Sequence, residues 1–352
     1  MRLFVSVAAC VALVWGEESQ ETCSFNAQGQ YSCRKENFGV EIGVACKPKK
    51  SRQVSKAPNA NAAKNCGEEA YYIASTDKYL SFGIAELSFG IVDGVAGWTE
   101  SRDDTSAFSL ALVRGSKDAF EKSTLRKPKP LDLMMKGYEA VLNGGGANLG
   151  ISNAVFLVID KETGKLDAVN LGHAGYAITR NRNGIGLQEE KSSTLDDICK
   201  FSTYLSWMHS RNVNKYPPVR SFPTSSVLKV GNFVQAGDVV IIGSDGFFDN
   251  VFGDEILDET RCFLYPVYKN HATYFEQRSE YDDDPLPILS KTAQKFQQPM
   301  FDLSHSLTLM ADSYGHDHGH EPPPCKEACA HQCVGRVDDT TAITIYIHGK
   351  IV

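Results

Sequence analysis

The chain has 352 residues, of which 42% are hydrophobic and 22% charged, close to the usage of ordinary globular proteins. This composition excludes a disordered chain, a collagen-like fibre and a coiled coil. The 36 basic and 43 acidic residues leave a net charge of −7, which argues against a dedicated nucleic-acid-binding protein because such proteins usually carry a basic domain.

The first sixteen residues have the pattern of a secretory signal peptide. Arg2 precedes an apolar stretch from Leu3 to Trp15, and the small residue Gly16 suits a cleavage site. Thirteen apolar residues are too few to span a bilayer, so we expect no stable membrane span after signal removal. The sequence predicts the secretory pathway and secretion, with an uncleaved anchor and delivery to an organelle as open alternatives.

The chain contains ten cysteines, and Cys10 lies in the predicted signal peptide. The remaining nine are an odd number, so at least one thiol is free or pairs between chains. Cys23 and Cys33 lie in a polar extension over residues 17–36, which we expect to be closed by a disulfide bond. A His- and Cys-rich insertion is predicted over about residues 312–336, where disulfides and a His-rich loop are favoured over a zinc site. It contains His316, His318, His320, Cys325, Cys329, His331 and Cys333.

Strands and helices follow in groups from about residue 37 to the C-terminus. Apolar and β-branched runs predict strands, and apolar residues at helical spacing predict helices. Because helices do not alternate regularly with strands, the order predicts one α+β domain over residues 37–352. Expected strands cover 38–46, 70–74, 87–92, 153–160, 166–171, 176–180, 227–230, 239–243 and 341–347, and expected helices cover 105–122, 131–142, 254–264 and 286–310. The basic, acid-free segment between residues 47 and 67 is predicted to be a solvated loop.

Acidic residues lie where the expected strands meet loops. These residues are Glu68, Glu69, Asp93, Asp245 and Asp338. A single Asp-Gly pair is more often a tight turn, but several acidic strand ends within one sheet system can converge. Carboxylate oxygens are the hard ligands that Mg²⁺ and Mn²⁺ prefer, and a glycine after the aspartate lets backbone or water approach an ion closely. The pattern indicates a divalent-metal site if the strands share a sheet system.

Four segments resemble, in order, the motifs of the type 2C metal-dependent protein phosphatases. Residues 89–98 (FGIVDGVAGW) resemble FGVADGVGGW, and residues 243–250 (GSDGFFDN) resemble TDGLFDN. Residues 338–341 (DDTT) resemble the terminal DDIT, and residues 67–70 (GEEA) resemble the first acidic motif. The resemblance is closest to the branch that includes a mitochondrial member, and it extends from about residue 37 to the C-terminus.

The resemblance implies two packed, mostly antiparallel β-sheets flanked by helices, with two Mg²⁺ or Mn²⁺ ions between the sheets. It implies that Asp93, Asp245, Asp338 and the carbonyl of Gly94 bind the ions, while Glu68 and Glu69 hold metal-bound waters. The implied activity is hydrolysis of phosphoserine and phosphothreonine in a phosphoprotein substrate, by a hydroxide that bridges the ions. The oligomeric state is left open.

Four positions depart from the family pattern. Glu69 stands where the family usually has Asp, and His173 replaces the acid of a GDSG motif. His173 is a structural loop residue, a proton donor or a phosphate contact. Lys64 matches by spacing the phosphate-binding Arg, without its bidentate fork, and residues 150–154 read GISNA instead of GSSTA. These departures leave one alternative, a weak or inactive pseudophosphatase that acts as a binding module.

Overall fold

The structure is a computed structural model. It describes residues 22–25, 31–34, 39–49, 66–75, 86–94, 105–123, 128–144, 150–181, 187–192, 205–208, 219–221, 228–264, 286–323 and 334–348. The predicted signal peptide (residues 1–16), Lys64 and residues 324–333 of the predicted insertion lie outside these ranges. Among the described residues, no helix is both long enough and apolar enough to cross a membrane.

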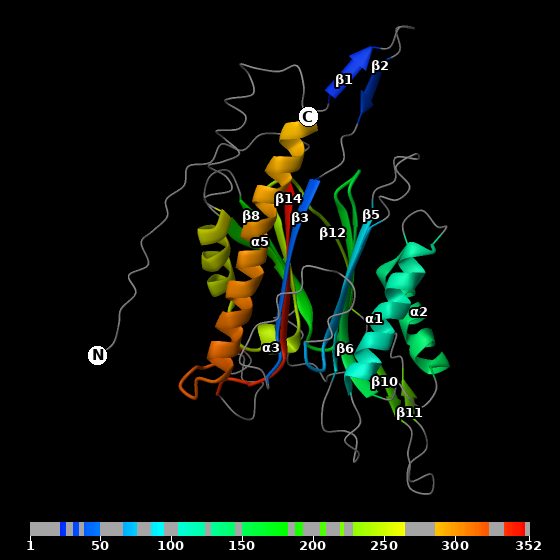
Figure 1. The fold of residues 1–352 in the computed structure, drawn as a ribbon, viewed down its shortest axis with the longest axis vertical. Helices are drawn as coiled ribbons and strands as arrows, with labels where there is room; N and C mark the ends of the chain where they lie inside the picture. Colours follow the sequence, from blue (N-terminus) through cyan, green and yellow to red (C-terminus); the bar gives the residue numbers. More distant parts are fainter. Residues whose placement is uncertain are drawn as a thin grey trace, which may run out of the picture.

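Two antiparallel β-sheets stand at the centre of the fold (Figure 1). The five-stranded sheet has the order β3 (Gly39–Lys47), β14 (Thr340–His348), β13 (Val239–Gly243), β8 (Gly175–Asn181) and β9 (Leu187–Ser192). The seven-stranded sheet has the order β11 (Val219–Ser221), β10 (Leu205–Met208), β6 (Gly150–Asp160), β5 (Glu86–Gly94) and β4 (Ala70–Ser75). Its two further strands are β7 (Lys165–Leu171), which pairs with β6, and β12 (Leu228–Phe233), which pairs with β7.

A separate two-stranded sheet lies in the predicted polar extension. It consists of β1 (Thr22–Phe25) and β2 (Tyr31–Arg34), which pair antiparallel. Cys23 lies directly opposite Cys33 in this register. The backbone pairing thus suits the disulfide predicted for the extension, and the bond itself stays a prediction.

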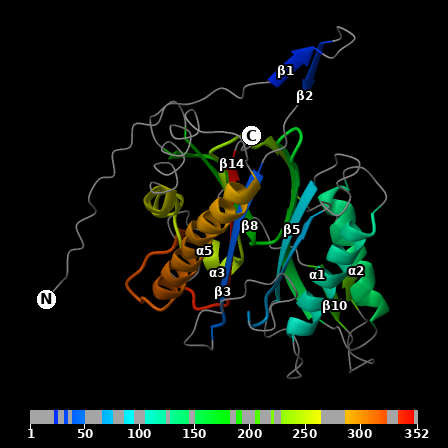
Figure 2. The ribbon, with the colours of Figure 1, turned by 45° about the horizontal axis from the view of Figure 1, so that its top comes forward.

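Helices cover the outer face of each sheet (Figures 1 and 2). Helices α1 (Thr105–Glu121) and α2 (Pro130–Asn143) pack on the seven-stranded sheet. Helix α3 (Asp245–Phe248), a helix over residues 253–264 and α5 (Leu286–Gly315) pack on the five-stranded sheet. The predicted four-layer sandwich of two sheets between helices is therefore confirmed.

The central core lies between the two sheets. Phe89, Ile91 and Leu157 of the seven-stranded sheet face Ile242 and Ile343 of the five-stranded sheet, and all five are fully buried. Every residue of β5 is buried, because its other face lies under the helices. Burying each large apolar side chain contributes about 2 kcal/mol. Because both faces of β5 are covered, its sequence is mostly apolar and does not alternate between polar and apolar residues, which is typical of such a strand.

The expected elements are found at nearly their expected bounds, with six additions, two of which are the strands β1 and β2 of the extension. Strands β9, β10 and β11 were not expected, and β9 has the polar sequence LQEEKS, which lacks the alternation that indicates a strand. Helix α3 begins at Asp245, where a turn was expected. Helix α5 continues through Pro299 and ends at Gly315, five residues beyond the expected end.

Glu41 is a buried acid outside the group of acidic residues at the strand ends, and it allows the effect of burial on stability to be measured. Its carboxyl is buried in β3, and burial raises its pKa to about 8. Because the pKa of Glu41 is higher in the folded than in the unfolded chain, the contribution of its carboxyl to stability is fully present below the unfolded-state pKa. That contribution is lost as the pH rises through the folded-state pKa. We expect the unfolding free energy of Glu41→Gln, taken relative to that of the wild type, to be about 2 kcal/mol larger at about pH 8 than at about pH 5. Urea unfolding at both pH values measures this, with the exposed Glu321→Gln as the control, and a difference that does not vary with pH would contradict the burial effect.

Candidate metal centre

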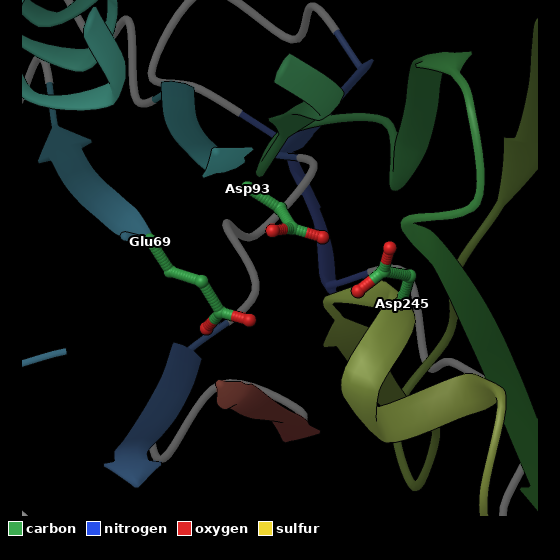
Figure 3. A group of neighbouring side chains, drawn as sticks. All are labelled: Glu69, Asp93 and Asp245. Carbon is green, nitrogen blue, oxygen red and sulfur yellow. The ribbon is translucent and has the colours of Figure 1, made fainter. Parts of the chain in front are cut away.

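Three carboxylates converge between the sheets (Figure 3). One carboxylate oxygen each from Glu69, Asp93 and Asp245 lies within 4.8 Å of the others. Glu69 directly precedes β4, Asp93 is the second-last residue of β5, and Asp245 begins α3 just after β13. The seven-stranded sheet thus supplies two of the acids and the five-stranded sheet supplies the third, and Figure 3 shows all three side chains pointing into one space.

Burial and mutual repulsion disfavour the charged forms of the acids in this cluster. Burial raises the pKa of Glu69 well above its ordinary value; hydrogen bonds from Thr341 and Ser244 oppose this shift, and the charges of Asp339 and Asp245 add to it. Burial, followed by the charges of Asp245 and Glu69, likewise raises the pKa of Asp93. Glu69 Oε1 and Asp245 Oδ1 are buried without a hydrogen-bond partner. Buried carboxylate oxygens at this spacing fit a hard divalent cation such as Mg²⁺ or Mn²⁺.

Asp338 lies at the rim of this cluster and not at its centre. Its side chain is 43% exposed, and its Oδ1 lies 3.1 Å from Nζ of Lys49. Burial and the charge of Asp245 raise the pKa of Asp338, and Lys49 lowers it. The converging carboxylates therefore include Glu69, for which the resemblance implied contact through water, and not Asp338, for which it implied direct contact. The ion pair with Lys49 accounts for the outward position of Asp338.

Glu68 and Gly94 join the two strands that carry Glu69 and Asp93. The N–H of Gly94 donates a hydrogen bond to the carbonyl of Glu68 at 3.3 Å. The carboxylate of Glu68 points to Lys49 Nζ at 3.2 Å. Glu68 thus belongs to the rim, together with Asp338. The metal-binding role of the Gly94 carbonyl stays a prediction.

His173 lies on the turn between β7 and β8, on the side of Asp245. Burial lowers the pKa of its imidazole, the charge of Asp245 raises it, and the charge of Arg336 lowers it. A lowered pKa favours the neutral imidazole, which can accept a hydrogen bond or bind a cation. The structure therefore places His173 beside the cluster, and its role as a phosphate contact stays a prediction.

Asn153 was not among the predicted site residues. It is buried in β6 directly opposite Asp93, and its Nδ2 donates to Asp93 Oδ2 at 3.4 Å and to Asp245 Oδ2 at 3.1 Å. One amide thus orients two carboxylates from opposite sheets. The signal available in the sequence was the departure GISNA, which places a polar residue inside an apolar strand.

Two basic residues near the acidic cluster were also missed. Lys49 belongs to the segment predicted as a solvated loop, yet its ammonium contacts both Glu68 and Asp338. Arg336 forms an ion pair with the buried Asp249, and the carboxylates of Asp249, Asp245 and Asp338 raise its pKa against the effect of burial. Neither lies within the four motifs, since Lys49 is 20 residues before Glu69 and Arg336 is two residues before Asp338, so the motifs did not indicate them.

The histidines described in the predicted insertion have structural contacts. Nε2 of His320 donates to the carbonyl of Asn250 at 2.8 Å, and its ring stacks on Tyr314 with centroids 4.2 Å apart. His316 Nδ1 donates to the carbonyl of Asp312 at 2.8 Å. The zinc alternative stays untested, because the cysteines from 325 to 333 lie outside the described residues.

Asn153→Ala tests the orienting role of this amide. Removing the donor shared by Asp93 and Asp245 frees both carboxylates, and loss of such an outer hydrogen bond typically lowers metal affinity about 10- to 100-fold. We expect a loss of this size for Mn²⁺, measured by calorimetric titration. The matched control is Asn232→Ala, which removes an amide that donates to Tyr176 Oη at 3.1 Å on β8. Equal Mn²⁺ affinity of the two variants would contradict the orienting role.

Sequence comparison finds relatives among protein phosphatases. The human Protein phosphatase PTC7 homolog is 26% identical over 181 residues, which cover 51% of this chain and 57% of that protein. The Danio rerio Protein phosphatase PTC7 homolog is 24% identical over 204 residues, which cover 58% and 64%. The 5-azacytidine resistance protein azr1 of Schizosaccharomyces pombe is 29% identical over 194 residues, which cover 55% and 60%. No protein-family model matches the sequence.

Among solved structures, the photosystem II phosphatase PBCP has the same fold. It superimposes with a TM-score of 0.55 at 19% identity, covering 89% of this chain and 100% of that one. The chain is therefore similar in sequence to proteins named as protein phosphatases and in fold to a solved phosphatase. The resemblance carried by the four motifs is thereby confirmed. The chain spans 57–64% of the length of the three curated relatives described above, so the activity of the whole protein is proposed below.

Proposed function

We propose that the protein is a metal-dependent serine/threonine phosphatase that hydrolyses phosphomonoesters in phosphoprotein substrates. The observation that carries this proposal is the cluster of the buried Glu69 and Asp93 with the half-buried Asp245, which lies between the sheets at three of the type 2C motifs. The fold shared with a solved phosphatase and the names of the sequence relatives support the same conclusion.

We propose that the three converging carboxylates, together with Asp338 and the Gly94 carbonyl, would hold two Mg²⁺ or Mn²⁺ ions. Such ions supply a water of lowered pKa and neutralise charge on the phosphoryl oxygens. The chain's own contribution is positioning: Asn153 orients two carboxylates, and Lys49 places a positive charge at the rim. A lysine ammonium there attracts an incoming phosphate as a point charge.

Hydrolysis of an aryl phosphate and of a phosphothreonine peptide tests the activity. We expect turnover by the purified mature protein with Mn²⁺ or Mg²⁺ and none with chelator. No turnover by the folded protein with either ion would overturn the enzyme proposal and point to the alternative, a binding module without catalysis. Nothing among the residues that the structure describes favours that alternative.

We also propose that the protein is exported through the secretory pathway. The pattern of residues 1–16 supports this, and so does the disulfide between Cys46 and Cys66, because such bonds persist in oxidising compartments. Expression of the tagged full chain in eukaryotic cells tests it, and we expect a secreted protein that begins at Glu17. Retention of the uncleaved chain in the cytosol would overturn the proposal.

A further inference from the structure

A buried disulfide lies next to the candidate metal centre and has no part in the proposed chemistry. It joins Cys46, near the end of β3, to Cys66, which lies three residues before Glu69, and both cysteines are almost fully buried. Cys46 pairs in register with Thr341, whose hydroxyl donates a hydrogen bond to Glu69 Oε2. The disulfide therefore joins the segment just before Glu69 to β3, the strand that pairs with Thr341, which hydrogen-bonds the Glu69 carboxylate.

The carboxylate of Asp339 makes a second link between the same two chain segments. Its Oδ1 accepts the backbone N–H of Lys49 at 2.7 Å, and its Oδ2 accepts the backbone N–H of Glu68 at 2.8 Å. Asp339 is buried, and Gly67 lies against it with a φ of 74°, where a Cβ would overlap the carboxyl group. Each oxygen of one carboxylate thus holds one segment, close to the disulfide that joins them.

These two links determine where the rim of the acidic cluster lies. With both segments fixed, the Lys49 ammonium reaches Glu68 at 3.2 Å and Asp338 at 3.1 Å, and Glu69 points at Asp93 and Asp245. Without them, Glu69 would keep its own hydrogen bonds and the pairing of Glu68 with Gly94, but the chain just before it would lose two anchors. Freed carboxylates bind a cation more weakly because ordering them costs conformational entropy at the moment of binding.

We propose that Asp339 and the Cys46–Cys66 disulfide are positioning elements of the metal centre, and that the oxidised chain is its high-affinity state. The inference rests on the proposed function. A dithiol would convert the high-affinity state to the low-affinity state: it transfers two electrons and two protons, the Cys46–Cys66 bond breaks to two thiols, and the dithiol closes to a cyclic disulfide. Neither group touches substrate, and each acts through the acids that it places.

Calorimetric titration with Mn²⁺ tests the inference on the full mature chain. The forms compared are the oxidised wild type, the wild type reduced by a dithiol that is then removed under argon, Cys46→Ala/Cys66→Ala, and Asp339→Asn. Asn offers one carbonyl oxygen and turns an amide donor toward the second N–H, so it keeps one link and breaks the other. We expect Mn²⁺ affinity to fall about 10-fold or more in all three altered forms, and reoxidation to restore the wild type.

Three controls separate positioning from a general loss of structure. Cys262→Ala removes an exposed cysteine of the helix over residues 253–264 and is expected to leave affinity unchanged. Dithiol treatment of Cys46→Ala/Cys66→Ala is expected to cause no further loss. At saturating Mn²⁺ the altered forms should recover kcat to within a few-fold, because the ion itself reorders the freed acids, whereas a misfolded centre would not recover.

The outcomes separate this inference from the proposed function. If the oxidised wild type binds no Mn²⁺, the metal-dependent phosphatase is overturned, and this inference with it. If the wild type binds Mn²⁺ and the reduced form and Asp339→Asn bind it equally well, the proposed function stands and the positioning role is overturned. Should the double cysteine variant fail to fold, as near-ultraviolet circular dichroism would show, the reduced wild type and Asp339→Asn decide the question.

Discussion

Asp93→Asn and Asp245→Asn are each expected to lower kcat/KM for an aryl phosphate by about 10³-fold. Both substitutions keep the shape of the side chain and remove one negative charge from the converging cluster. The loss follows because the cluster then holds a divalent cation weakly and no longer supplies the charge that the phosphoryl group requires. Activity measured over a titration of Mn²⁺ gives the size of the effect.

The same Asp93→Asn variant is expected to be more stable than the wild type when no divalent ion is present. Burial and neighbouring acids raise the pKa of Asp93, so its contribution to stability is full at acid pH and is lost as the pH rises through the folded-state pKa. An amide does not titrate, and the advantage of the variant should therefore grow with pH. Thermal unfolding in chelator at about pH 5 and about pH 8 measures it.

Lost activity with gained stability distinguishes a metal ligand from a structural residue, because loss of a structural residue lowers both. Asp118→Asn is the control, since Asp118 is exposed on α1 and pairs there with Lys122. It should change neither quantity beyond about 0.5 kcal/mol or about twofold. An Asp93→Asn variant that keeps its turnover, or that unfolds more readily without ions, would contradict the role given to the cluster.

Much of the fold follows from local patterns in the sequence. β5 and β6 are long apolar runs, and α1 and α2 have apolar residues at helical spacing, so these elements were predicted within a few residues. β9 was missed because its polar residues pair through backbone hydrogen bonds with β8, a partner that its own composition does not indicate. The short helix α3 was missed because four residues are too few to show a period.

The candidate site was predictable in kind but not in detail. The motifs named the acids, but the ion pair of Asp338 at the rim is with Lys49, which lies nearly 290 residues before it. The strand register places Asn153 opposite Asp93, and the sequence does not give that register. Contacts between residues this distant in sequence are properties of the assembled sheets, whereas spacing within a motif describes one element only.

Gly246→Ala is expected to be the most damaging change of a single small group near the site. A Cβ at Gly246 would overlap the carbonyl oxygen of Asp339 and lie 3.1 Å from Cβ of Asp338. The overlapped atom belongs to the backbone, so the segment that enters β14 must shift. Overpacking of this kind costs about 1 to 3 kcal/mol of unfolding free energy. A displacement of about 1 Å near the chemistry lowers the rate about 10²-fold, and we expect at least this loss in kcat/KM.

Gly231→Ala is the matched control, because a Cβ there would meet nothing nearer than Asp167 Oδ1 at 3.5 Å. It lies in β12, outside the metal centre, and should leave both stability and turnover near those of the wild type. Urea unfolding and steady-state kinetics of the two alanine variants give the comparison. A Gly246→Ala variant with wild-type kcat/KM would mean that the segment before β14 does not rest on α3.

Gly246 has a packing role in addition to the one that the Asp-Gly pair suggested in the sequence, which stays a prediction. There, glycine was expected to let backbone or water approach an ion. In the structure, its missing side chain lets the backbone of Asp339 lie against α3, and the carboxylate of Asp339 in turn holds the segments of Lys49 and Glu68. Close packing at Gly246 thus links the position of α3 to that of Asp339, which holds the rim residues Lys49 and Glu68. Gly246→Ala should therefore reduce Mn²⁺ affinity, as is expected for Asp339→Asn, and a loss of turnover at unchanged affinity would show that Gly246 does not act through Asp339.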